Sequence, residues 1–308
     1  MKTKLLKNSV KEIKDTFKRF ISILLMSFLG VGFFSGLVAC GPDMREAIDT
    51  YYDVSNTYDI VITSTLGLTD EDIKAIQNLD QSYNVYGVNS VDKEITIKEE
   101  KFNAKFIELK SEINDIDLVS GKRPENDNEC VLDSQFAKRN KYEIGNKIKT
   151  EENEYEVVGL AKSPLYITST RGTTNIGTGT INCFIYVNKI EQDYYTNIYV
   201  TSEKARDEQT SSNEYNEIIT EIKNKINSVA EERENARYNE IKESANSKIE
   251  DARKELQSKK NDAYSQINEG KEEIRNAELQ ISKAKKEIAN NKQKLTEQKQ
   301  SVEKQFQS

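Results

Sequence analysis

The chain has 308 residues, of which 31% are charged and 36% hydrophobic, and its formal net charge is -7. It contains no histidine, which excludes Ser-His-Asp and Cys-His catalysis together with the usual zinc sites. The acidic balance argues against a nucleic-acid partner. We therefore expect a protein that is not an enzyme and has no catalytic, cofactor-binding or metal-ligating residues.

Residues 3–19 have the pattern of an amphipathic helix. Leu6, Val10, Ile13 and Phe17 recur at helical spacing, and lysines occupy the other face. Such a helix lies on the inner membrane surface, where its lysines meet anionic lipid headgroups. The alternative is a plain basic flank that only sets the topology of the segment that follows.

An apolar run from Phe20 to Ala39 has no charged residue and predicts a transmembrane helix over 20–40. About 20 residues at ~1.5 Å each span a hydrocarbon core of ~30 Å. Because the preceding residues 1–19 are rich in lysine, we expect the N-terminus in the cytoplasm and the bulk of the chain outside the cell membrane. Two alternatives are a cleaved secretory signal and a lipoprotein box ending at Cys40, whose thiol would carry the lipid.

Gly30, Gly32 and Gly36 suggest a face of this helix that packs closely on another membrane helix. The frequency of glycine in membrane helices explains them equally well. Gly41 and Pro42 are expected to stop or bend the helix, which then resumes.

Residues 41–205 predict an α+β domain outside the membrane. Thr69 predicts a capped helix up to about Leu79, and a short helix is expected over 134–140. Loops are expected over 64–67 and, exposed and mobile, over 168–180. The predicted strands are 58–63, 83–88, 94–97, 105–109, 129–132, 147–150, 155–160, 183–187 and 197–201.

Three cysteines, Cys40, Cys130 and Cys183, show no metal-ligand spacing. Cys130 and Cys183 are expected to stay free, with a disulfide between them as the alternative outside a cell.

Residues 206–308 predict a long coiled-coil helix that needs a partner helix. An apolar residue recurs every seven positions, and small residues such as Ala277 and Ala284 form the companion seam. The seam residues are Ile267, Ile274, Ile281, Ile288, Leu295 and Val302. The sequence reaches Ser308 inside this pattern, so we expect either another chain as partner or a longer protein of which this is the amino-terminal part.

From Arg19 onward the sequence resembles the amino end of FtsX-like, MacB-like permeases of ABC transporters. The resemblance covers about residues 5 to 200, plus the coiled-coil insertion that some of these permeases carry. The residues that carry it are 20–25, 29–36, Gly41-Pro42-Asp43-Met44, 64–69, Gly121-Lys122-Arg123-Pro124, Glu129, 142–148, Val157-Val158-Gly159-Leu160 and Ser163-Pro164-Leu165-Tyr166.

This resemblance implies a permease subunit that binds no ATP itself and couples a separate ABC ATPase to work outside the membrane. That work would be the export of peptides, lipids or lipoproteins, or the regulation of an envelope enzyme. The partners implied are the ATPase, membrane lipids, and further permease segments or a second permease. The later transmembrane helices of the family are not in the sequence. The alternative function is a membrane-tethered or lipid-anchored coiled-coil scaffold or adhesion protein.

Overall fold

The computed structural model describes residues 4, 7, 11–12, 14–210 and 212–306, with side chains up to residue 302. The chain divides into two compact units, Met1–Glu234 and Asn235–Ser308. The amphipathic helix predicted over 3–19 lies largely outside the described residues.

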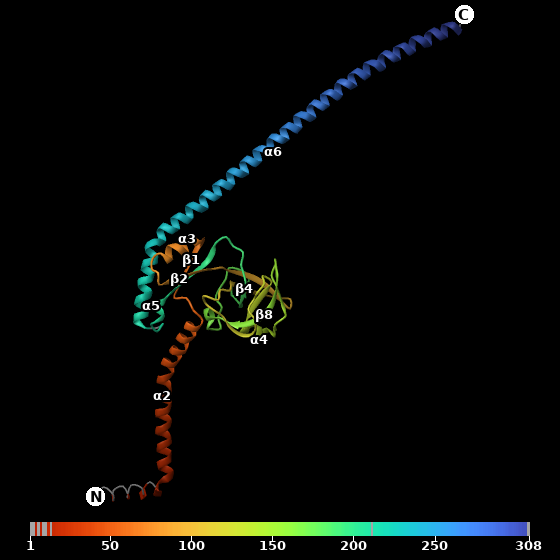
Figure 1. The fold of residues 1–308 in the computed structure, drawn as a ribbon. Coiled ribbons are helices and arrows are strands. Elements are labelled where there is room, and N and C mark those ends of the chain that lie inside the picture. The colour runs from red at the N-terminus through yellow and green to blue at the C-terminus, as the bar shows by residue number, and fades with distance from the viewer. Residues whose placement is uncertain (1–3, 5–6, 8–10, 13, 211, 307–308) are drawn as a thin grey trace. The chain divides into compact units, whose positions relative to one another are not determined.

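The apolar run lies in α2 (Phe17–Val54), a helix that continues through Gly41 and Pro42 (Figure 1). By length and composition α2 is able to cross a membrane. The helix does not stop after Gly41, so of the two expected effects of Gly41 and Pro42 the stop was wrong. A proline inside a helix removes one backbone hydrogen bond and crowds the carbonyl four residues earlier, which kinks a helix without having to end it.

A three-stranded antiparallel sheet follows α2, in the order β1-β10-β2. Its strands are β1 (Ile60–Leu68), β2 (Tyr83–Val88) and β10 (Tyr195–Ser202). The loop expected over 64–67 is instead part of β1, which shifts register between Thr63 and Leu68. We call this sheet, with α3 and the helices after β10 up to residue 234, the small-sheet lobe.

The predicted helix after Thr69 is confirmed as α3 (Asp70–Gln77). The Asp72 carboxylate accepts hydrogen bonds from the Thr69 backbone nitrogen at 2.7 Å and from the Thr69 hydroxyl at 3.0 Å. These contacts satisfy donors that the first turn of a helix leaves free, so the helix begins here.

The second sheet has seven strands in the order β5-β8-β6-β9-β4-β3-β7. Because β7 pairs with β8 as well as with β3, the sheet closes on itself, and we call it the barrel lobe. Its strands are β3 (Ser90–Ile97), β4 (Glu100–Glu108), β5 (Asp117–Gly121), β6 (Glu129–Asp133), β7 (Lys147–Lys149), β8 (Glu154–Lys162) and β9 (Cys183–Val187). The barrel also carries α4 (Ser134–Asn140) and the 3₁₀ turn η1 (Pro164–Tyr166).

The interior of the barrel is aliphatic and aromatic. Phe106, Leu132, Ile148 and Val157 are at most 1% exposed and belong to one cluster. Burial of this kind contributes about 1.5–3 kcal/mol for each large apolar side chain and is what holds the strands together. Cys130 and Cys183 are buried in the same cluster and are free.

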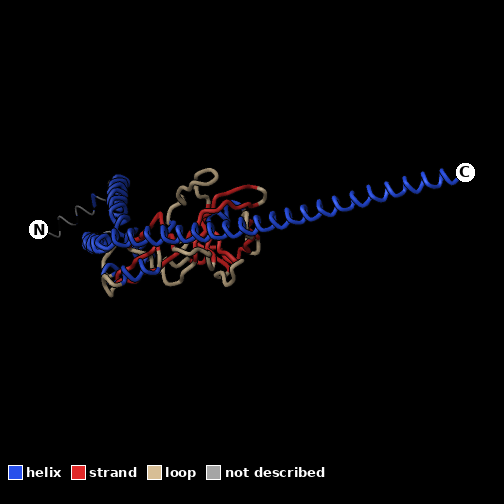
Figure 2. The backbone as a smooth tube through the Cα atoms, turned by 90° about the horizontal axis from the view of Figure 1, so that it is seen from above, coloured by secondary structure: helices blue, strands red, loops and turns tan. Residues whose placement is uncertain are grey.

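After β10 the chain forms the short helix α5 (Glu203–Arg206) and then α6 (Asn213–Phe306). The long helix predicted for this region is confirmed, and Figure 2 shows it as one uninterrupted helix. Its first part, residues 213–234, belongs to the compact unit that also holds the two lobes. We call residues 213–234 the root of α6 and residues 235–306 its distal part.

Candidate coupling junction

The end of α2 is bound to the segment that leads into α6. The Asp49 carboxylate accepts a hydrogen bond from the backbone nitrogen of Thr210 at 2.9 Å and a second one from the Thr210 hydroxyl. Two donors on one carboxylate oxygen fix both the position and the orientation of the acceptor, and a charged acceptor makes such bonds stronger than neutral ones. Thr210 lies three residues before α6 begins.

The residues that follow α2 are bound to the barrel lobe. The backbone nitrogens of Asn114 and Asp115 donate to the carbonyls of Asn56 and Ser55 at 3.0 Å and 2.7 Å. The Asn114 side chain accepts from the Tyr58 backbone nitrogen at 3.1 Å. The loop before β5 is thus fixed to the chain immediately after α2.

Asp59 binds both the small sheet and the root of α6. Its carboxylate accepts from the Ser202 backbone nitrogen at 2.8 Å and from the Tyr215 hydroxyl at 3.0 Å. Burial raises the pKa of Asp59, and the two hydrogen bonds together with Arg206 oppose that rise. The pKa of the Tyr215 phenol is raised by burial and by the neighbouring Asp59 carboxylate.

The root of α6 packs on the small sheet through one apolar face. Ile219, Ile222 and Ile226 recur at helical spacing and are buried in one cluster with residues of α3 and all three strands. At the end of the root, the Arg233 guanidinium pairs with Asp72 of α3 at 2.8 Å. The root therefore moves with the small-sheet lobe rather than as a free helix.

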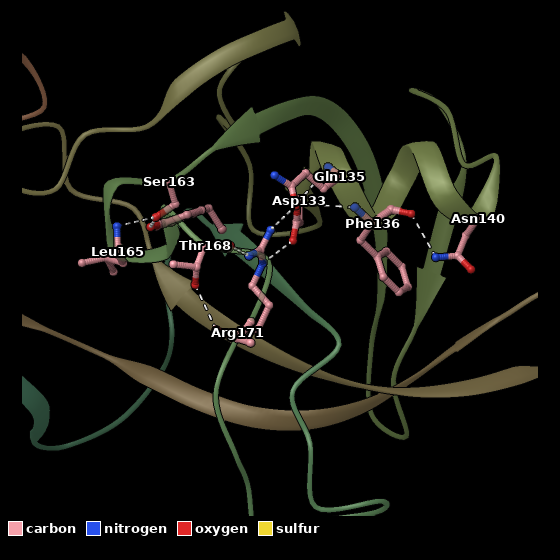
Figure 3. Close-up of polar contacts among 10 residues, drawn as sticks. Asp133, Gln135, Phe136, Asn140, Ser163, Leu165, Thr168 and Arg171 are labelled. Carbon is pink, nitrogen blue, oxygen red and sulfur yellow. Dashed lines mark hydrogen bonds and ion pairs between the residues drawn. The ribbon is translucent and has the colours of Figure 1, made fainter. Parts of the chain in front are cut away.

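On the barrel side, Arg171 fixes the beginning of the loop 168–180 through polar contacts with Asp133, Gln135 and Thr168 (Figure 3). Its Nε lies 2.6 Å from Asp133, and the two side chains are 4% and 2% exposed. The same guanidinium donates to the Gln135 side chain at 3.2 Å and to the Thr168 carbonyl. The other oxygen of Asp133 accepts from the Gln135 backbone nitrogen at 2.9 Å and so caps α4.

This buried arginine corrects the expectation for residues 168–180. The loop is largely exposed, as predicted, but Arg171 anchors its beginning. The Asn103 side chain binds its end, donating to the carbonyls of Ile176 and Thr180 at 3.2 Å and 3.0 Å. A loop sequence rich in threonine and glycine does not predict either of these two contacts.

Two cavities lie where these elements meet. One of about 220 Å³ is lined by residues from the end of α2, η1, α5 and the root of α6, among them Tyr52, Leu165, Thr210 and Tyr215. The other, of about 230 Å³, brings Tyr51 of α2 next to the segment that Arg171 holds.

The residues singled out from the sequence lie elsewhere. Gly30, Gly32 and Gly36 are exposed on α2, and apart from the surrounding backbone of the helix itself no described atom lies within 4 Å of the position that a Cβ would take on any of them. Cys40 is exposed on α2, and its thiol donates to the Met44 sulfur at 3.7 Å. The coiled-coil seam is exposed along the distal part of α6: Ile267, Ile274, Ile281, Ile288, Leu295 and Val302.

The junction residues themselves, Asp49, Asp59, Thr210 and Tyr215, were not found from the sequence. Each is a common residue type in a segment without a motif, and the two members of the Asp49–Thr210 pair are 161 positions apart. Only the folded structure brings these four residues close to one another.

Among the described residues, α2 is the one candidate membrane helix, and the fold beyond it consists of two lobes, both bound to the end of that helix. Residues 21–235 match the family model described as the MacB-like periplasmic core domain, and the chain belongs to that family. It is accordingly a protein of the ABC transporter permease type. A search of curated proteins finds no match.

Several solved structures are similar to parts of this chain. The extracellular domain of the noncanonic ABC-type transporter YknZ from Gram-positive bacteria is 16% identical, with a TM-score of 0.32 over 51% of this chain and 85% of that chain. The periplasmic region of MacB from Actinobacillus actinomycetemcomitans is 17% identical, with a TM-score of 0.31 over 52% and 73%. A domain of a putative permease protein from Porphyromonas gingivalis is 12% identical, with a TM-score of 0.26 over 49% and 68%.

Proposed function

We propose that this chain is a permease subunit that transmits the cycle of a separate ABC ATPase to work outside the membrane. The observation that carries the proposal is that the end of α2 is bound to both lobes and to the segment before α6 through Asp49, Ser55 and Asn56. A tilt or shift of α2 would act on all of them. The ATPase partner rests on the family, whose permeases work with such subunits.

The proposal places the N-terminus in the cytoplasm and both lobes outside, because the lysine-rich residues precede the apolar run. The work done outside would be the export of a peptide, lipid or lipoprotein, or the regulation of an envelope enzyme. ATP would be bound by the partner subunit, so this chain would need no nucleotide site.

The proposal is tested on the full chain purified from its native membrane together with its bound subunits. We expect a nucleotide-binding subunit to co-purify. In nanodiscs, spin labels at the exposed positions Lys74 and Lys122 should report a distance between the lobes that changes when ATP is added.

The junction variant is Asp49→Ala, which removes the acceptor of both Thr210 bonds. Its matched control is Glu46→Ala, an exposed acid one turn earlier on the same helix. The ATP-dependent change should persist in the control and be lost in Asp49→Ala, with the ATPase still bound. Absence of an ATPase from the purified material, or an unchanged response in Asp49→Ala, would refute the proposal.

Orientation has its own test at Cys40, which lies near the outer end of the apolar run. A membrane-impermeant maleimide should label Cys40 in intact cells. Labelling only after the membrane is opened would reverse the orientation, and a lipid mass on this thiol would establish the lipoprotein alternative.

A further inference from the structure

The distal part of α6 carries an exposed seam of large residues beside a seam of small ones. From residue 263 to 302, the isoleucine seam residues are 52–66% exposed, Leu295 is 68% exposed and Val302 49%. The companion positions, three residues after a large one, are Gly270, Ala277, Ala284, Asn291 and Gln298, with Ala263 before them, so the seam is small up to Ala284 and polar beyond it. An apolar stripe of this length on a polar helix is stable only against a second helix.

A parallel second copy fits this seam poorly. In a parallel pair each flanking residue faces the flanking residue five positions further along in the partner. Glu273 would then face Glu278, and Lys294 would face Lys299, so two kinds of contact repel, whereas only Glu287 facing Lys292 attracts. The large residues would also face one another in wide layers that alternate with narrow layers of alanine and glycine up to residue 284 and with polar layers at Asn291 and Gln298.

An antiparallel second copy reduces both problems. Most large residues then face small ones, because the direction of one seam is reversed. In the register centred between residues 282 and 283, Ile281 faces Ala284, Ile288 faces Ala277, Leu295 faces Gly270 and Val302 faces Ala263 of the second copy, while Ile274 faces Asn291 and Ile267 faces Gln298. Layers that combine one large and one small residue keep the distance between the helices even over most of the overlap.

The charges select the same arrangement and its register. In antiparallel copies centred between residues 282 and 283, Glu273 lies opposite Lys294 and Glu278 lies opposite Lys285, and both kinds of contact attract. One kind of contact, Lys271 with Lys292, repels. Within the described residues, none of the first four forms an ion pair in the single chain. A shift by one heptad in either direction sets like charges opposite each other at the centre, Glu287 on Glu287 or Glu278 on Glu278.

We propose that residues 263–302 bind a second copy of this chain as an antiparallel two-stranded coiled coil. The two copies meet by the distal parts of α6, with the roots at opposite ends of the pair. The overlap of about 40 residues is ~60 Å long at ~1.5 Å per residue.

The test uses the full chain in detergent and measures its dimer dissociation constant by analytical ultracentrifugation. Glu273→Lys turns two attractive contacts of the antiparallel pair into repulsive ones, and we expect the dimer to weaken about tenfold. The same change would strengthen a parallel pair, since the introduced lysine would then face Glu278. Adding Lys294→Glu should restore the dimer, and Glu272→Lys, on the outer face, is the matched control and should leave it unchanged.

The register is tested by oxidative cross-linking of two chains that each carry one new cysteine, in a Cys40→Ser background. Gln280→Cys on one chain and Glu287→Cys on the other face each other in the antiparallel pair and should form a disulfide. Neither variant alone should cross-link to itself at the same rate. A monomer at all concentrations, a dimer strengthened or unaffected by Glu273→Lys, or cross-links within each single variant would overturn the proposal.

Discussion

Ile222→Ala tests whether the root of α6 is held on the small sheet. Ile222 is 3% exposed, and the change removes three carbon atoms from its cluster. At ~0.8 kcal/mol for each buried carbon, the transfer loss is about 2.5 kcal/mol. The cavity that remains adds to this, so we expect a loss of about 3–4 kcal/mol, within the usual ~2–5 kcal/mol for such a truncation.

The measurement is native-state hydrogen exchange, because a chain with two lobes and a long helix does not unfold as one unit. Backbone amides of residues 216–227 should lose protection by the stated amount, whereas those of β6 in the barrel should not change. The matched control is Ile274→Ala on the distal part, where the side chain is 62% exposed and the root should exchange as before. Unchanged protection of the root in Ile222→Ala would refute the assignment of its stability to this apolar face.

Three further predictions concern the two lobes. Arg171→Ala leaves the buried Asp133 carboxylate without its partner and should destabilise the barrel by about 3–5 kcal/mol, measured by native-state hydrogen exchange of the β6 amides; an Asp133→Leu, Arg171→Met double variant should recover only part of the loss, because Asp133 also caps α4. Hydrogen bonds from Ser82 lower the pKa of Asp80 from 3.8 to about 2, so the stability it contributes should be complete above pH ~4 and lost as the pH falls toward 2; a carboxyl NMR titration midpoint near 4 would contradict this. Burial raises the pKa of the Cys130 thiol to about 12, so thiol reagents at pH 8 should leave it unmodified until the chain is denatured.

The elements of the fold were largely predictable because local patterns carry them. The strands β2 and β9 and the helix α4 have the predicted bounds, and α3 was found from its cap. β5 was missed because its five residues, Asp117–Gly121, are mostly exposed and show no apolar alternation. Gly121 ends this strand at φ +84, a conformation that favours glycine, and the sequence indicated only a turn there.

The arrangement of the elements was not predictable in the same way. β10 lies between β1 and β2, and β9 between β6 and β4, so the pairings join segments far apart in the chain. The buried pair of Asp133 and Arg171 shows why the site residues could not be predicted from the sequence either. Its arginine lies in a run of threonine and glycine that by composition is a solvent-exposed loop, and its burial depends on partners that the loop sequence does not show, above all the carboxylate at the end of β6.

The continuity of α2 matters most for the proposed function. A break at Gly41 and Pro42 would have let the membrane segment move without moving the residues beyond it. Because α2 instead remains helical to Val54, a displacement of its membrane part reaches Asp49 along the same helix, in which only Pro42 leaves out a backbone hydrogen bond. Asp49 contacts the segment before α6, on the small-sheet side, and Ser55 contacts the loop before β5, on the barrel side. A tilt of α2 would therefore displace both lobes and change the position of one lobe relative to the other. Coupling to a distant ATPase requires such a change.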